Sequence, residues 1–126
     1  MIRLELLESG RSREVFALVV NERCETYEFL AGLKEKPRRK VEAVLKRLSD
    51  IGRAGHEEHI VKRLEDNVFE IKENTTTSRL FFFEWKQQIV VCTHAARKPA
   101  GNKRYQIEID RVKRLMNQCL EENKLP

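Results

Sequence analysis

Two short apolar segments, separated by three polar residues, constrain the fold of this chain most strongly. Residues 79–85 read Arg-Leu-Phe-Phe-Phe-Glu-Trp, and residues 89–93 read Ile-Val-Val-Cys-Thr. Aromatic and β-branched residues favour strands, and residues 86–88 are short enough for a hairpin connection, so we predict a β-hairpin. Because side chains alternate along a strand, half of the aromatic residues are expected in the core under helices. A platform for stacked bases is the alternative.

The segments before this hairpin predict two strands and two helices. Apolar and charged residues alternate over 2–6, the period of a half-buried strand, and residues 15–20 form a continuous apolar run typical of a strand buried on both faces. Apolar residues then recur at helical spacing over 27–33 and over 41–48, with Pro37 interrupting because proline breaks a helix interior. The pair is expected to form a helical hairpin that covers one face of a sheet.

The C-terminal part completes an α+β pattern. Residues 68–71 predict one more strand, and apolar residues from Ile109 to Cys119 predict a C-terminal helix that begins near Lys103. The expected order is N-terminal strands, an α-helical hairpin, a three-stranded antiparallel β-meander and a C-terminal helix, which is typical of the α+β class. A length of 126 residues is that of one ordinary domain, so we expect a single domain over 1–126.

The positive charge is concentrated near the C-terminal end. Residues 97–114 contain seven basic and two acidic residues, so this segment alone carries the net charge of +5 of the whole chain. A basic segment on an otherwise balanced protein suggests a polyanionic partner such as nucleic acid. An acidic protein would satisfy the same charge.

Cysteine usage and the first residues favour the cytoplasm. Cys24, Cys92 and Cys119 are odd in number and widely spaced, which argues against a disulfide framework. The alternating start lacks the apolar run of a signal peptide, and no segment reaches the roughly 18 apolar residues of a membrane span. We expect Cys92 and Cys119 to be small buried residues rather than catalytic thiols.

Three segments resemble the RelE/ParE superfamily of toxins, and most closely its HigB-like, phage-derived branch. Residues 64–72, Leu-Glu-Asp-Asn-Val-Phe-Glu-Ile-Lys, resemble the family strand L-x-D-G-L-Y-E-L-R. Residues 79–83 resemble Y-R-V-F-Y-F, and residues 93–98, with Lys103 behind them, resemble L-H-G-F-x-K-K followed by a further lysine.

The resemblance spans roughly residues 15–120 and leaves 1–14 as an N-terminal extension that can form an extra strand. It implies a RelE-like fold and the toxin of a type II toxin–antitoxin system. Such toxins are metal-independent endoribonucleases that cleave messenger RNA, often on the ribosome, and a small helix-turn-helix antitoxin neutralises them. The resemblance therefore implies no cofactor and no membrane, and it leaves the oligomeric state open.

Metal-free RNA cleavage uses the 2′-hydroxyl of the substrate as nucleophile, so the protein must move protons and stabilise charge at phosphorus. The candidate catalytic residues are Arg79, His94 and Lys98. Arg79 matches the family arginine that holds the scissile phosphate, which a guanidinium can contact through two parallel hydrogen bonds. A strand-edge arginine in a surface ion pair is the alternative. His94 can act as acid or base near neutral pH or be a structural histidine at the sheet edge, and Lys98 can offset charge or act as the base.

Further cations and one tyrosine are candidates for RNA binding: Lys72, Arg97, Lys103, Arg104 and Tyr105. An exposed charge run that only solvates the surface is the alternative for the cations around residues 97–104. The spacing of His56 and His59 could bind a metal on a helix, but their polar, glycine-containing surroundings favour a solvated loop. No metal site is predicted.

Two other functions fit the resemblance. One is a ParE-like gyrase inhibitor, although the segments around Arg79 and His94 favour the ribonuclease. The other is a phage-derived binding module that keeps the fold without the chemistry. Departures from the family pattern support the module: Lys72 replaces an arginine, Ala95 and Ala96 replace a Gly-Phe pair, and Pro99 replaces a lysine.

Overall fold

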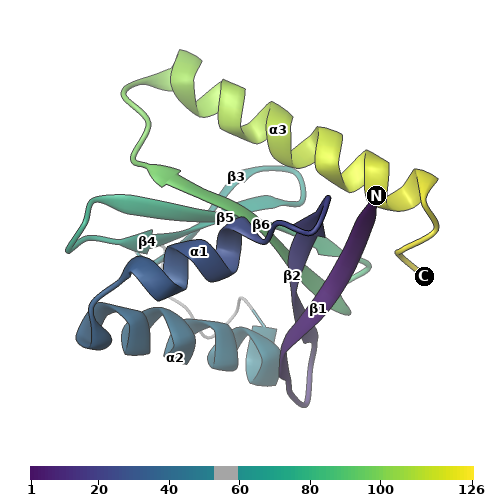
Figure 1. Cartoon of the computed structure of the whole chain (residues 1–126), viewed down its shortest axis with the longest axis horizontal. Coiled ribbons are helices and arrows are strands. Elements are labelled where there is room, and N and C mark those ends of the chain that lie inside the picture. The colour runs from purple at the N-terminus through teal and green to yellow at the C-terminus, as the bar shows by residue number, and fades with distance from the viewer. Residues whose placement is uncertain (53–59) are drawn as a thin grey trace.

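A six-stranded sheet with helices on both of its faces organises the chain (Figure 1). The computed structural model describes residues 1–52 and 60–126. In chain order the elements are β1 (Ile2–Ser9), β2 (Glu14–Val20), α1 (Glu25–Gly32), α2 (Glu35–Ile51), β3 (Val61–Glu65), β4 (Val68–Glu73), β5 (Ser78–Trp85), β6 (Ile89–Arg97) and α3 (Asn102–Glu121). The predicted α+β class, N-terminal strands, helical hairpin and C-terminal helix are confirmed. The metal-spaced histidines His56 and His59 lie outside the described residues.

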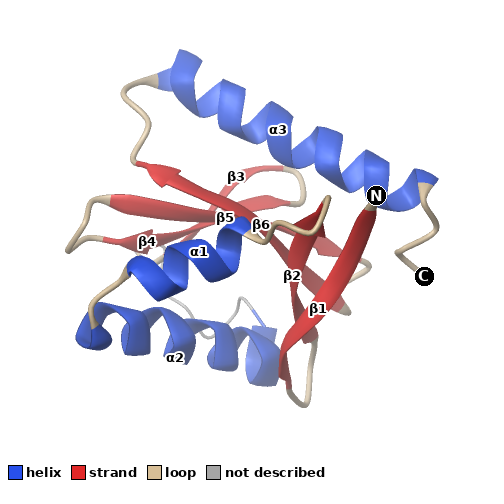
Figure 2. Ribbon diagram, viewed as in Figure 1, coloured by secondary structure: helices blue, strands red, loops and turns tan. Residues whose placement is uncertain are grey.

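The strands follow the order β1-β2-β6-β5-β4-β3 across the sheet (Figure 2). β2 and β6 are parallel, and every other neighbouring pair is antiparallel. The predicted meander therefore has a fourth strand, β3, and joins the N-terminal hairpin through one parallel pair. Sequence reasoning missed β3 because its five residues, Val-Lys-Arg-Leu-Glu, are short and mostly polar. Pairing with β4, rather than local propensity, makes this segment a strand.

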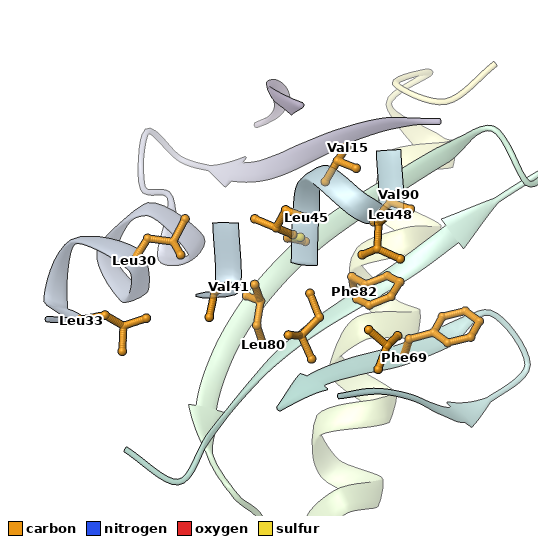
Figure 3. Close-up of a cluster of buried hydrophobic side chains, with 13 residues drawn as sticks. Val15, Leu30, Leu33, Val41, Leu45, Leu48, Phe69, Leu80, Phe82 and Val90 are labelled. Carbon is orange, nitrogen blue, oxygen red and sulfur yellow. The ribbon is translucent and has the colours of Figure 1, made fainter. Parts of the chain in front are cut away.

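The sheet separates two apolar cores. Under α1 and α2, the first core includes Val15, Leu30, Leu33, Val41, Leu45, Leu48, Phe69, Leu80, Phe82 and Val90 (Figure 3). Under α3, on the opposite face, the second includes Ile2, Leu18, Val68, Phe81, Phe83, Val91, Ile109, Val112, Leu115 and Cys119. All three phenylalanines of β5 are fully buried, more than the half expected, because helices cover both faces of the central strand.

Pro37 lies inside α2 rather than between the two helices. The helical conformation is interrupted at Leu33 and Lys34, which are extended, and α2 begins at Glu35. The proline therefore lies in the first turn of α2. The first backbone N–H groups of a helix have no partner within the helix, so a proline there removes no hydrogen bond. The predicted interruption is therefore real but falls a few residues earlier.

The turn between β1 and β2 packs closely against the end of α2. The backbone N–H groups of Ser12 and Arg13 both donate to the carbonyl oxygen of Ser49, each at 2.9 Å. A Cβ atom added at Gly10 would lie 2.4 Å from the carbonyl carbon of Ser49. This contact leaves room only for glycine.

Replacing Gly10 by alanine is expected to lower the free energy of unfolding by about 1–3 kcal/mol, because the added methyl group must displace backbone. Thermal and urea unfolding measure this change. Gly32→Ala is the matched control, since Gly32 ends α1 and has nothing within 4 Å of an added Cβ. Its expected effect is neutral or a gain of about 0.4–1 kcal/mol. Equal losses in both variants would contradict the packing argument.

Two further observations concern the described residues only. None of the helices there is long and apolar enough to cross a membrane. The three cysteines are free, and Cys92 and Cys119 are fully buried, as predicted.

Candidate nucleic-acid interface

A pocket of about 570 Å³ opens between the N-terminal half of α3 and strands β3, β4 and β5. Its walls are Lys62, Arg63 and Leu64 of β3, Glu70 and Lys72 of β4, Arg79 of β5, Lys98 after β6, and Asn102, Tyr105, Gln106 and Ile109 of α3. Five of these side chains are basic and one is acidic, so the pocket is positively charged. It brings together four of the predicted site residues: Lys72, Arg79, Lys98 and Tyr105.

Strand register places two cations directly opposite each other in this wall. Lys72 of β4 pairs with Arg79 of β5. Both side chains point to the face under α3, because they alternate in step with Val68 and Phe81 of the second core. Like charges opposite each other destabilise a sheet. The two facing cations are therefore unfavourable by themselves, and they attract anions.

Arg79 is the most deeply buried cation of the pocket, with an exposed fraction of 5%. Its Nε lies 3.8 Å from Oε1 of Glu70, and its Nη1 donates to the carbonyl oxygen of Ser78 at 2.9 Å. The ion pair is therefore buried and not the surface pair considered from sequence. Tyr105 of α3 lines the pocket together with Glu70 and Arg79. Burial raises the pKa of Tyr105, and the charge of Glu70 raises it further, so the hydroxyl stays protonated at neutral pH.

The loop that carries Lys98 is tied to the turn between β4 and β5. The backbone N–H of Lys98 donates to the carbonyl oxygen of Thr77 at 2.8 Å. That turn is held by Glu73, whose carboxylate accepts the backbone N–H groups of Thr75 and Thr76 at 2.9 and 2.8 Å. Burial alone would raise the pKa of Glu73, but the hydrogen bond from the Thr76 hydroxyl and those from the two backbone N–H groups outweigh burial, and the pKa is lowered. A charged Glu73 thus fixes the turn while the Lys98 side chain stays exposed.

His94 lies outside the pocket and is fully buried beneath α3. Its ring stacks on Phe81 with centroids 5.1 Å apart. Nδ1 lies 2.9 Å from the Thr93 hydroxyl, and Nε2 lies 2.9 Å from a carboxylate oxygen of Glu108. Burial lowers the pKa of His94, and the hydrogen bond to Glu108 only partly offsets it. Of the three predicted catalytic residues, this is the one that does not line the pocket.

The other predicted RNA-binding cations lie beyond the pocket. Arg97 ends β6, and Lys103 and Arg104 lie in the first turn of α3. All three are exposed, and no ion pair holds them within residues 1–52 and 60–126. Two cations further along α3 are engaged in ion pairs: Arg111 with Glu25, and Lys113 with Glu65. Within the basic segment, Arg111 and Lys113 are thus engaged by carboxylates, whereas Arg97, Lys98, Lys103 and Arg104 form an exposed group next to the pocket.

Sequence reasoning missed Glu70 and the two β3 cations, Lys62 and Arg63. Glu70 occupies the glutamate position of the family strand motif, so the resemblance contained the signal, but a carboxylate was not expected in an anion site. Lys62 and Arg63 were missed because β3 was not predicted. Among the described residues, no group of three or more His, Cys, Asp or Glu side chains is placed to hold a metal ion.

Comparison with known protein families covers the part of the chain that forms the pocket. The family described as phage-derived protein Gp49-like (DUF891) matches residues 28–117, which include every residue that lines the pocket. It is a family of RelE-like toxins of toxin–antitoxin systems, and the observed arrangement is consistent with a RelE-like fold; the match does not separate out the HigB-like branch. No curated protein matches the chain. The chain therefore belongs to the Gp49-like family of phage-derived proteins.

Proposed function

We propose that this chain is the toxin of a type II toxin–antitoxin pair and cleaves messenger RNA as a metal-independent, ribosome-dependent endoribonuclease. The observation that carries the proposal is the facing pair Lys72 and Arg79 in the wall of the basic pocket. A phosphodiester bound there would relieve the repulsion between the two cations. The exposed cations Arg97, Lys103 and Arg104 extend the positive surface for flanking phosphates.

In this proposal the 2′-hydroxyl of the RNA loses its proton to a base and attacks the adjacent phosphorus. The bond to the 5′-oxygen of the next nucleotide breaks and that oxygen takes up a proton, which leaves a 2′,3′-cyclic phosphate and a 5′-hydroxyl. Arg79 contacts the scissile phosphate and stabilises the charge that develops on it. Lys72 and Lys98 add positive charge, and Lys98, on the exposed rim, can exchange a proton with the RNA. Tyr105 donates a hydrogen bond or stacks against a base.

The proposed partners follow from the same assignment. A small helix-turn-helix antitoxin, encoded beside the toxin, would cover the basic pocket and so exclude RNA. The ribosome would present the messenger RNA. We place the protein in the cytoplasm, in keeping with its free cysteines.

Induced expression of the wild-type chain, with growth followed and messenger RNA 5′ ends mapped, tests this function. Growth arrest with new, clustered 5′ ends is the expected result. Arrest with intact messages and altered DNA supercoiling would instead identify a gyrase inhibitor. No arrest and no new 5′ ends would identify a binding module without chemistry.

Lys72→Gln is expected to weaken RNA binding while stabilising the free protein by about 0.2–1 kcal/mol, because it removes the repulsion opposite Arg79. Thermal unfolding and titration with a labelled single-stranded RNA measure the two effects. Lys36→Gln, on the exposed side of α2, is the matched control for the loss of one charge. A loss of stability in Lys72→Gln with unchanged RNA binding would remove Lys72 from the proposed site.

A further inference from the structure

Glu70 is an unusual component of an anion-binding pocket. It is 1% exposed and lies diagonally across from Arg79, two residues along the strand, since Glu70 pairs with Phe81 while Arg79 pairs with Lys72. Its Oε1 and the Nε of Arg79 are 3.8 Å apart, and neither atom has a hydrogen-bond partner among the described residues. Two buried charged groups thus face each other without a full hydrogen bond.

Folding alone does not account for this pair. Removing two charges from water is unfavourable, and well-packed apolar residues in place of a buried ion pair often leave stability unchanged or improved. On the same sheet face, Val68 and Phe83 are apolar. The cations Lys72 and Arg79 also lie there, and Lys62 of β3 is directly opposite Glu70. A carboxylate here also weakens the attraction of the pocket for RNA. Among the cations of the pocket, Arg79 is the one whose ion pair with Glu70 is observed in the described residues, so we look to Arg79 for the role of this carboxylate.

The contacts of Arg79 define that role. The guanidinium donates through Nη1 to the carbonyl oxygen of Ser78 and faces Glu70 through Nε, in the pocket that Tyr105 also lines. Lys72, directly opposite, would push a mobile guanidinium away. The negative charge of Glu70 balances that repulsion and keeps Arg79 against the sheet. An arginine held in one orientation loses less entropy when it binds a phosphate.

We propose that Glu70 is a positioning residue, which fixes the Arg79 guanidinium in the orientation that receives the phosphodiester. The substrate in this statement rests on the proposed function, but the fixation of Arg79 does not. Two measurements therefore separate the two ideas.

The first measurement follows the Nε–Hε group of Arg79 by NMR in ¹⁵N-arginine-labelled protein. In the wild type, Arg79 is expected to give a separate resonance with slow hydrogen exchange. In Glu70→Gln this resonance should move toward those of free arginines and exchange faster. Glu28→Gln is the matched control, because Glu28 pairs with Arg23 on the surface and should leave the Arg79 signal unchanged. An unchanged Arg79 resonance in folded Glu70→Gln would overturn the proposal.

The second measurement is a double-mutant cycle on RNA cleavage. Glu70→Gln is expected to slow cleavage by about 10- to 100-fold, the effect of a misplaced reacting group. In an Arg79→Lys background the same substitution should change the rate less than about threefold, because the group that Glu70 positions is gone. Equal losses in both backgrounds would show that Glu70 acts independently of Arg79 and would reject the positioning role.

The proposal can still be tested if Glu70→Gln does not fold or if the wild type does not cleave RNA. If Glu70→Gln does not fold, Glu70→Asp keeps the charge but withdraws it by one methylene, and both measurements are repeated on that variant. It should shift the Arg79 resonance in the same direction and lower the cleavage rate, and an unchanged resonance and rate would overturn the proposal. If the wild type cleaves no RNA, the proposed function fails, and the NMR comparison alone still decides whether Glu70 fixes Arg79.

Discussion

Arg79→Lys is expected to lower the rate of RNA cleavage by about 100- to 1000-fold, the loss typical of removing one positioned donor to transition-state charge. Lysine keeps a positive charge beside the buried Glu70 carboxylate, so the protein should stay folded. It lacks the planar pair of N–H groups that contact two phosphate oxygens together. Cleavage of a defined message on purified ribosomes measures the rate, and growth after induction gives the same comparison in cells.

Lysine is a sharper test than alanine because of the surroundings of Arg79. With alanine, Glu70 would be left as a buried carboxylate without a counter-charge, and breaking a buried ion pair in this way lowers stability by about 3–5 kcal/mol. Loss of toxicity in Arg79→Ala could then reflect unfolding. The double variant Glu70→Gln/Arg79→Gln removes both charges together and gives a second folded protein without the guanidinium.

Arg39→Lys is the control for this prediction. Arg39 lies on α2, pairs with Glu35 on the surface and is far more exposed than Arg79, so the same substitution there should change neither cleavage nor growth arrest. A folded Arg79→Lys protein that cleaves at the wild-type rate would exclude Arg79 from phosphate contact. The proposed function would then need another cation of the pocket.

The pocket illustrates how far sequence reasoning can reach at a functional site. The family motifs led to Arg79, Lys98 and Lys72, Tyr105 was a further candidate beside them, and the structure brings these four residues into one pocket. They could be named because each lies in or near a recognisable segment. Glu70 could not be assigned a role, because only the cross-strand register between β4 and β5 shows that it lies beside Arg79. That register is a tertiary property.

Some elements of the fold could be predicted from local sequence, whereas others depend on tertiary packing. The apolar runs of β2, β5 and β6 and the amphipathic pattern of α2 were readable locally. β3 was not, since pairing with β4 makes it a strand. The position of α3 on the opposite face from α1 and α2 was also missed, because an apolar stripe tells that a helix is buried but not which face of the sheet it covers.

His94→Ala is expected to lower the free energy of unfolding by about 2–4 kcal/mol, through the cavity beside Phe81 and the hydrogen bonds lost at Glu108 and Thr93. Urea unfolding at pH 7.5 measures the change. The size of the loss follows from the contacts, since His94 is 0% exposed and both ring nitrogens are bonded. A loss below about 0.5 kcal/mol, the range of ordinary surface substitutions, would contradict the structural role.

The loss of unfolding free energy in His94→Ala is expected to become smaller as the pH falls. Burial lowers the pKa of folded His94; the charge of Arg111 lowers it as well, and these effects outweigh the raising by Glu108 and Glu25. In the unfolded chain histidine titrates near about 6.5, so below that pH the unfolded state takes up a proton that the folded state does not. Wild-type stability should therefore fall as the pH drops below about 6.5, until the lowered folded pKa is reached. His94→Ala lacks this component, so the stability difference between the two proteins should narrow over the same range.

His94→Gln separates the structural role from the catalytic one. Glutamine can retain one hydrogen bond but cannot exchange a proton near neutral pH, so loss of a general acid or base would slow cleavage by about 100- to 10,000-fold. The position of His94 outside the pocket predicts instead a rate per folded molecule within about threefold of wild type, because Arg79 and Lys98 are unchanged and the lost contacts lie beneath α3. Cleavage assayed at a temperature where both proteins are fully folded decides between the two. A large loss of rate in a fully folded variant would mean that α3 moves to admit RNA to His94, and would place this histidine back in the reaction.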